Sequence, residues 1–218
     1  MTNINQHVDL AFPVRGTTLP RDHAYALYGA LSRAMPGLHG ATWLGVQSIP
    51  GRLVNDELDI KSGSYLRLRV PTDKIGELLP LAGSTIEVHG RTLKLNAPTI
   101  HTLTSAAALD AQLVVIRLTG GVAKPFDKAA FDERFAAEVN RQMERLGVKG
   151  AMTLRGRRSI AVGGQRIIGH AVGVTGLSED HSLVLQAHGL GGKRRMGCGL
   201  FRPARVALAI TAEAPLAS

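Results

Sequence analysis

A segment near the C-terminus combines glycine with positive charge in a pattern that suits phosphate binding. Residues 189–201 read GLGGKRRMGCGLF, in which two Gly-apolar-Gly triplets enclose five residues, three of them cationic. Glycine accepts positive φ and lets a phosphate approach backbone N–H groups without a Cβ in the way, and the cations would neutralise the bound charge. We interpret this glycine-rich loop as a phosphate-binding element rather than a plain turn. Its candidate binding residues are Gly189, Gly191, Gly192, Lys193, Arg194, Arg195, Gly197 and Gly199.

Positive charge is concentrated in the last third of the chain. The formal net charge of the 218 residues is +9, and the segment from residue 149 onward carries ten Lys and Arg against three acids, or +7 of that total. Arg155, Arg157 and Arg158 form a second tight cluster. Adjacent like charges repel, and nucleic-acid phosphates would compensate them with release of counterions. We therefore expect an RNA- or DNA-binding surface rather than only a solvated cationic face.

Composition excludes several other classes of protein. Hydrophobic residues make up 44% of the chain, which is enough to bury a core and rules out disorder for most of it. Cys198 is the single cysteine, so an intrachain disulfide and a cysteine-based zinc site are excluded. No run approaches the ~18 apolar residues of a membrane span, and the first residues lack the apolar run of a signal peptide. We expect a soluble, cytoplasmic protein without a membrane partner.

The elements that must position these residues follow a repeated order. In the first half, alternating apolar residues predict a strand over 8–14, and three- and four-residue spacing predicts a helix over 24–35 that Pro36-Gly37 ends. Strands are expected over 42–49 and 65–70. A short helix over 73–81 and a hairpin that turns at His89-Gly90 complete the first unit.

The second half begins in the same way. A strand is expected over 111–118 and a helix over 127–146, and strands are expected over 152–162, 166–174, 182–186 and 201–210. The order predicts an α+β fold of two tandem ferredoxin-like (βαββαβ) domains. Their bounds would be residues 1–105 and 106–218. The alternative is one α+β domain with a long mixed sheet.

Two blocks of the sequence resemble a known family. The two Gly-apolar-Gly triplets, five residues apart with Lys and Arg between them, resemble the glycine-rich loop of the repeat-associated CRISPR proteins. The block from Leu19 to Tyr25 (LPRDHAY), with the helix and the Leu38-His39 pair that follow, is similar to the first helix and subsequent histidine of the CRISPR RNA-processing endoribonuclease. From Val8 to Phe201 the chain resembles the variant of myxobacterial-type systems.

This resemblance implies a pair of ferredoxin-like domains that bind the repeat hairpin of a CRISPR precursor transcript. The family cleaves once per repeat without a metal or other cofactor and leaves a 2′,3′-cyclic phosphate. Many members remain bound as subunits of the interference complex. Such cleavage needs groups that move protons at the 2′-OH and the 5′-oxygen, and cations for the phosphorane charge. Histidine suits either proton transfer near neutral pH.

The resemblance assigns catalysis to the region of the first helix. His39 matches the family's catalytic histidine, although capping of the helix's terminal carbonyls is the alternative role for it. His23 is the second candidate for acid or base, or else a residue that orients the helix. Ser32 stands where the family often has a tyrosine. Tyr28, one turn earlier, is therefore the candidate phenol unless it only packs in the core.

The cation that would stabilise the transition state is left open by the sequence. The family often has a lysine after the catalytic histidine, but none lies between His39 and Lys61, which leaves Arg52 or Lys193. A non-cleaving RNA-binding scaffold subunit is therefore the alternative function. A generic binder of single-stranded RNA is disfavoured because aromatic residues are only 4% of the chain, too few for base-stacking platforms.

Overall fold

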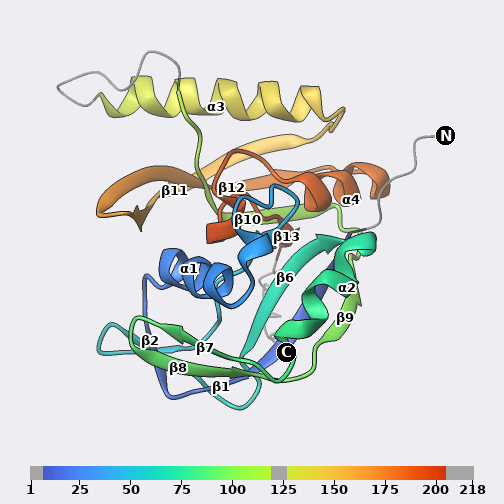
Figure 1. Ribbon diagram of the computed structural model, residues 1–218. Coiled ribbons are helices and arrows are strands. Elements are labelled where there is room, and N and C mark those ends of the chain that lie inside the picture. The colour runs from blue at the N-terminus through green and yellow to red at the C-terminus, as the bar shows by residue number, and fades with distance from the viewer. Residues whose placement is uncertain (1–6, 119–126, 205–218) are drawn as a thin grey trace, which may run out of the picture.

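The structure is a computed structural model that describes residues 7–118 and 127–204. The two halves of the chain form separate antiparallel sheets, one above the other in Figure 1, with α3 on the outer side of the upper sheet and α1 between the two sheets. The alternative of one long mixed sheet is therefore wrong. An α+β fold built on antiparallel sheets is confirmed.

The sheet of the first half is built around β1 (His7–Arg15). β1 pairs with β6 (Tyr65–Pro71) so that Val8 lies opposite Val70 and Leu10 opposite Leu68, and all four side chains are buried. The strand order is β3-β6-β1-β8-β7, and β9 also pairs with β1. The other strands are β3 (Gly45–Val46), β7 (Thr85–Val88), β8 (Arg91–Leu95) and β9 (Thr99–Thr102).

The helices of the first half cover this sheet. α1 (Ala24–Ala34) buries Leu27 and Leu31 in the same core, and it ends at Met35 because a residue before proline is pushed out of the helical region. A 3₁₀ turn, η1 (Pro36–Leu38), follows. The expected short helix is three consecutive turns, η2 (Thr72–Lys74), α2 (Ile75–Leu78) and η3 (Leu79–Leu81). A small separate sheet contains β2 (Thr18–Pro20), β4 (Arg52–Val54) and β5 (Glu57–Asp59).

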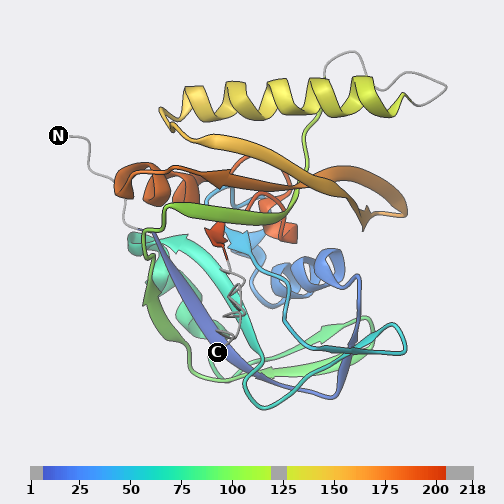
Figure 2. The same ribbon diagram turned by 180° about the vertical axis from the view of Figure 1, so that it is seen from behind.

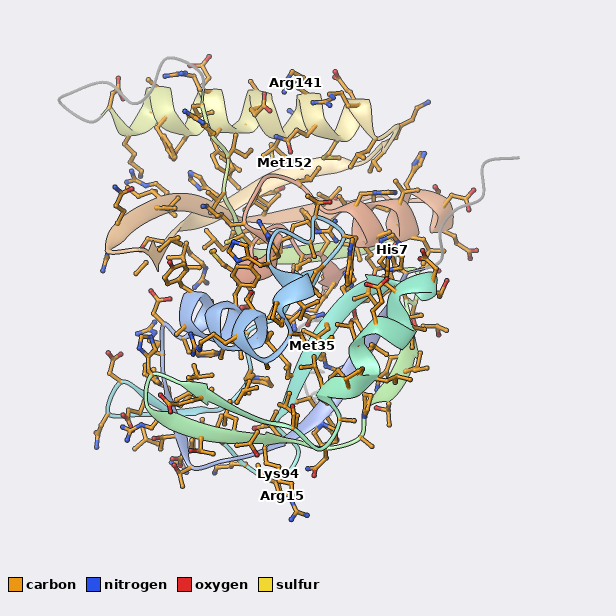
Figure 3. The ribbon with its side chains drawn as sticks, in the orientation of Figure 1. His7, Arg15, Met35, Lys94, Arg141 and Met152 are labelled. Carbon is orange, nitrogen blue, oxygen red and sulfur yellow. The ribbon has the colours of Figure 1, made fainter. Side chains whose placement is uncertain are left out.

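The second half forms its own antiparallel sheet, with helices packed on it. Its sheet has the order β11-β12-β10-β13, and the 18-residue α3 packs its apolar stripe on one face. Figure 3 shows Met152 beneath α3 and Arg141 on the outer side of the helix, with Arg15 and Lys94 at the opposite end of the molecule. The elements are β10 (Ala108–Val114), α3 (Lys128–Arg145), β11 (Ala151–Val162), β12 (Gln165–Thr175), α4 (Glu179–His188), η4 (Arg194–Met196) and β13 (Arg202–Pro203).

One element differs in type from the sequence prediction. Residues 182–186, expected as a strand, lie inside the helix α4. Ser178 caps the helix by accepting a hydrogen bond from the His181 N–H, and two acidic residues in the first turn favour its N-terminus. These local signals outweigh the short apolar run. The last expected strand, over 201–210, is seen only as β13, since residues beyond 204 lie outside the described part.

The two halves meet through a small apolar cluster and several polar bonds. Val115, Ile160 and Cys198 from the second half pack with Ala24 from the start of α1. Asp22 accepts a hydrogen bond from the Ala161 N–H at 2.9 Å. Figure 2 shows from behind that the β11–β12 hairpin extends over α1. Across residues 7–118 and 127–204, none of the helices is long and apolar enough to span a membrane.

Candidate active site

The turn after α1 presents His39 to solvent. Leu38 is 2% exposed and anchors the turn in the core, and the His39 N–H donates to the carbonyl of Pro36 at 3.0 Å. The His39 side chain itself is exposed. The proline and glycine of this turn thus place an imidazole at the surface.

The hydroxyl of Tyr28 connects this turn to the glycine-rich loop. It accepts hydrogen bonds from the Gly40 N–H at 3.2 Å and from Arg195 Nη1 at 2.8 Å, and it donates to the Leu38 carbonyl at 3.4 Å. The Arg195 guanidinium also lies 5.0 Å from the centre of the Tyr28 ring. Because Leu38 and Gly40 flank His39, a single phenol holds the backbone on both sides of His39 and a cation from the other half.

His23 occupies a very different environment at the start of α1. The residue is 1% exposed, and both ring nitrogens are engaged with backbone groups: Nδ1 with the Pro20 carbonyl at 2.9 Å and Nε2 with the Ile49 N–H at 3.1 Å. This pairing places the proton on Nδ1. Burial lowers the pKa of His23, so the ring is neutral at neutral pH. Of the two roles expected for His23, the geometry supports orientation of the helix and leaves no free nitrogen for proton transfer.

The glycines of the loop serve the chain's own packing. Gly189, Gly191, Gly197 and Gly199 adopt positive φ, as the sequence predicted. A Cβ on Gly189 would lie 2.1 Å from the Gly199 carbonyl oxygen, and one on Gly199 would lie 2.0 Å from the Leu190 carbonyl oxygen. The two triplets therefore lie against each other at a distance that only glycine allows.

The prediction that the backbone N–H groups of the loop's glycines bind phosphate is wrong. The N–H groups of all five glycines donate within the protein, and three of their acceptors lie outside the loop and α4: the side chain of Gln142 and the carbonyls of Leu113 and Val115. The loop thus has its glycine amides occupied before any ligand arrives. Phosphate contact from this loop would therefore not come from its glycine amides.

The three cations of the loop point to different surroundings. Lys193 is exposed, in the left-handed region at φ 63°. Arg194 turns inward, where Nη2 donates to the Ala187 carbonyl at 2.6 Å, and burial with the nearby charge of Arg69 lowers its pKa to about 10. Arg195 lies on Tyr28. From the sequence we interpreted these three residues as one basic cluster, but in the structure each side chain lies in a different environment.

The remaining candidate residues lie on α1 and β11. The Ser32 hydroxyl is buried and has no hydrogen-bond partner among the described residues. Arg155 forms an ion pair with Asp110 at 2.8 Å, and Arg157 lines a cavity of about 390 Å³ with His170 and Lys128. Arg158 is exposed. The three arginines are therefore not an isolated cluster of unpaired charges.

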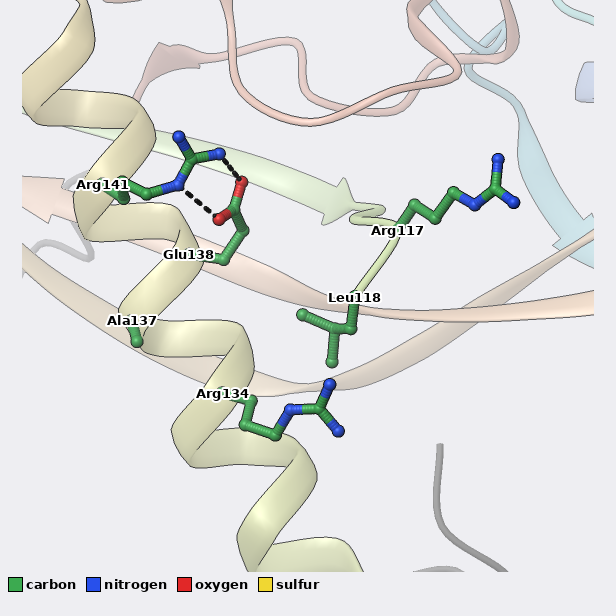
Figure 4. Close-up of a pocket in the computed structure, with 6 residues that line it drawn as sticks. All are labelled: Arg117, Leu118, Arg134, Ala137, Glu138 and Arg141. Carbon is green, nitrogen blue, oxygen red and sulfur yellow. Dashed lines mark hydrogen bonds and ion pairs between the residues drawn. The ribbon is translucent and has the colours of Figure 1, made fainter. Parts of the chain in front are cut away.

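A cavity beside α3 is connected to the glycine-rich loop through hydrogen bonds. It has a volume of about 350 Å³ and is lined by Arg117, Leu118, Arg134, Ala137, Glu138 and Arg141. Figure 4 shows the two hydrogen bonds between Arg141 and Glu138, both 2.7 Å long, which lower the pKa of Glu138 to about 2. Gln142 donates to Glu138 and accepts from the Gly191 N–H. The cavity wall is thus bonded to the loop, a connection that no sequence pattern indicated.

Two solved structures share the fold of this chain over most of its length. The chain matches "CRISPR associated protein Cas6" with a TM-score of 0.66 at 13% identity, covering 91% of this chain and 99% of that one. It matches "An RAMP protein binding different RNA substrates" with a TM-score of 0.64 at 13% identity, covering 90% and 98%. The fold is therefore that of CRISPR-associated proteins of the Cas6 type.

The sequence comparisons identify the family. Residues 8–206 match the family model described as Cas6 Crispr. A CRISPR-associated endonuclease Cas6 of Myxococcus xanthus is 40% identical over 201 residues, which are 92% of this chain and 83% of that protein. The chain belongs to the Cas6 family, and the resemblance to the CRISPR RNA-processing endoribonuclease, including its myxobacterial variant, is confirmed.

Proposed function

We propose that this protein is an endoribonuclease that cleaves the repeat hairpins of CRISPR precursor transcripts to release guide RNAs. Its relative of 40% identity is named a CRISPR-associated endonuclease. The observation that carries the proposal is the Tyr28 hydroxyl, which joins the backbone around His39 to Arg195 of the glycine-rich loop. An exposed imidazole and a guanidinium fixed by the same phenol are groups of the kind that metal-independent RNA cleavage uses.

In this mechanism the 2′-oxygen of the RNA attacks the adjacent phosphorus and the bond from phosphorus to O5′ breaks. The 2′-OH loses a proton and O5′ gains one, so the products are a 2′,3′-cyclic phosphate and a 5′-hydroxyl. His39, as a neutral imidazole, takes the proton of the 2′-OH, and the imidazolium so formed gives a proton to O5′ as its bond to phosphorus breaks. Arg195 donates to the non-bridging oxygens as negative charge develops there. Tyr28 positions both groups, because its hydroxyl is fully engaged with protein partners.

Each half of the chain is a ferredoxin-like domain in this proposal, with bounds at residues 1–105 and 106–218. The strand orders support this: β3-β6-β1-β9 in the first half and β11-β12-β10-β13 in the second place the strands in the same relative positions. Two separate apolar cores, one per half, support the boundary. The first domain supplies His39, on the turn after α1, and the second domain supplies the glycine-rich loop.

RNA would lie along the face where the loop meets α1. Lys193 is the exposed cation of the loop, and Arg157 and Arg158 add positive charge from the β11 strand that reaches over α1. The glycines contribute to RNA binding by fixing the loop's shape. A larger interference complex containing this protein and its product RNA is the further partner that the family resemblance implies.

Product analysis with a radiolabelled repeat RNA tests this function. We expect a single cut in the presence of EDTA, a 2′,3′-cyclic phosphate on the upstream fragment, and no cut when the nucleotide at the cleavage site lacks its 2′-OH. EDTA-sensitive cleavage would contradict the mechanism. Intact repeat RNA bound with high affinity after long incubation would instead support the scaffold function.

A further inference from the structure

A buried ion pair of the first half reaches the second half on either side of the glycine triplets. Asp9 of β1 and Arg69 of β6 are opposite each other in the strand register, and they are 8% and 1% exposed. Arg69 Nε and Nη2 donate to the two carboxylate oxygens at 2.8 and 3.0 Å. The carboxylate also accepts from Gln47 Nε2 at 3.2 Å. The Arg69 guanidinium is therefore fixed in position and orientation by the first half.

The third nitrogen of Arg69 holds both ends of the loop. Nη1 donates to the carbonyl of Gln186 at 3.0 Å and to the carbonyl of Phe201 at 2.6 Å. Gln186 lies in the last turn of α4, where carbonyls lack helical partners. The N–H of Leu190, which would have been its helical partner, donates instead to Gly199. One guanidinium of the first half thus anchors the last turn of α4, three residues before the loop, and the last residue of the loop segment.

The loop between these two anchors is rigidly connected within itself. The N–H groups of Met196 and Cys198 both donate to the Lys193 carbonyl at 2.8 and 3.3 Å. The close approach of the two glycine triplets closes the base of the loop. A shift of the anchored ends would consequently be transmitted to Arg195, whose guanidinium meets Tyr28 in the candidate active site.

We propose that Arg69, oriented by Asp9, is a positioning residue for catalysis: it sets where the glycine-rich loop lies relative to α1 and thereby where Arg195 meets the His39 turn. This inference rests on the proposed cleavage function. Net stabilisation is not the reason to expect such a pair, since buried ion pairs are often no better than apolar packing. The geometric effect of the Asp9–Arg69 pair is to hold one donor, Arg69 Nη1, in a fixed position for the carbonyls of Gln186 and Phe201.

The test combines Arg69→Lys with Tyr28→Phe in a double-mutant cycle. Lysine keeps the charge but cannot hold a bidentate carboxylate and two carbonyls at once. We expect Arg69→Lys to lower the single-turnover cleavage rate about 100-fold while the affinity for a 2′-deoxy repeat RNA changes little. In the Tyr28→Phe background, where Arg195 has lost its hydroxyl partner, the same substitution should cost much less. Additive effects would overturn the inference, because a merely structural role does not act through Tyr28.

Hydrogen exchange gives a readout that does not depend on activity. Amides of residues 189–199 should exchange faster in Arg69→Lys, while those of the β7–β8 hairpin remain unchanged. Arg91→Lys is the matched control, since Arg91 forms an exposed ion pair with Glu57 at 2.6 Å, and it should alter neither readout. Unchanged exchange of the loop in Arg69→Lys would overturn the inference even if the protein cleaves RNA. If Arg69→Lys does not fold, Asp9→Asn, which keeps an acceptor for Arg69, is expected to show the same pattern more weakly.

A wild-type protein that does not cleave would refute the proposed function alone. Exchange would then still decide whether Arg69 positions the loop.

Discussion

The two ends of α1 each carry a histidine, and their surroundings have opposite consequences. At the start of the helix, His23 is buried and both nitrogens are bound to backbone groups. At the other end, His39 is exposed on a turn whose backbone is held by Tyr28. The comparison shows that His39 is the imidazole available for chemistry: its backbone is held in place, but its ring is exposed and is not packed in the core.

Substitution of each histidine gives the sharpest test of this comparison. We expect His39→Ala to reduce the single-turnover cleavage rate by about 10²–10⁴-fold, as loss of a general acid or base does, with little change in affinity for repeat RNA. His23→Gln, measured at a temperature where it is folded, should retain most of the rate. Equal losses in both variants, or none in either, would remove the distinction between the two ends of the helix.

Arg195 is the next residue by expected effect. Arg195→Ala should lower the cleavage rate by about 10²-fold, because a donor to developing negative charge is lost, and Tyr28→Phe should have a smaller effect because it only loosens the position of Arg195. Arg33→Ala is a suitable control, since Arg33 lies on the same helix and bonds to the Glu87 carbonyl. A full rate in Arg195→Ala would assign the cation to another residue such as Lys193 or Arg52.

The buried end of the helix predicts a pH-dependent stability. Because burial holds the pKa of His23 below its usual 6.5, the unfolded chain takes up a proton that the folded chain resists. The contribution of His23 is complete above about pH 6.5 and declines as the pH falls toward the lowered value. His23→Gln should cost about 1 kcal/mol at neutral pH and show a shallower decline in urea unfolding between about pH 7 and 5. His170 and His188 have lowered pKa values of the same sign, so some decline should persist.

The smallest effect separates the loop cations. Lys193→Ala should reduce the slope of log Kd against log salt by about one unit, as expected for one phosphate contact. Arg194→Gln should leave this slope unchanged and lower the melting temperature, because its guanidinium bonds to the end of α4. The RNA affinity of both variants, measured by filter binding at several salt concentrations, gives these slopes. An unaltered slope for Lys193→Ala would mean that this side chain does not meet the RNA backbone.

Much of the fold follows from local sequence signals. The apolar stripe of α3, the proline that follows α1 and the turn at His89-Gly90 were all predicted, and both turn residues have the positive φ of a tight hairpin. The error at α4 has a physical reason, since its helical character depends on the Ser178 cap and on burial of Ser182 and Gln186, which are polar residues. Apolar periodicity cannot reveal a helix whose buried face is partly polar.

The sequence predicted which residues belong to the candidate site but not which of them are in contact. Residue spacing selected the loop, and the family resemblance selected His39 and Tyr28. Neither shows that Arg195 meets Tyr28 while Arg194 turns inward, because these contacts join residues 167 and 7 positions apart through the fold. The glycines were interpreted as amide donors for phosphate. Only the structure shows that the protein's own carbonyls and Gln142 take those donors first.

The buried pair between Asp9 and Arg69 also has a consequence for how the chain unfolds. Each half has a hydrophobic core of its own among the described residues, which would ordinarily allow the halves to melt one after the other. If the second half opened alone, Arg69 would exchange the carbonyls of Gln186 and Phe201 for water, so the opening would break these bonds between the halves in addition to the second half's own core. That energetic coupling favours a single cooperative transition, so that neither half survives for long as an independent fragment.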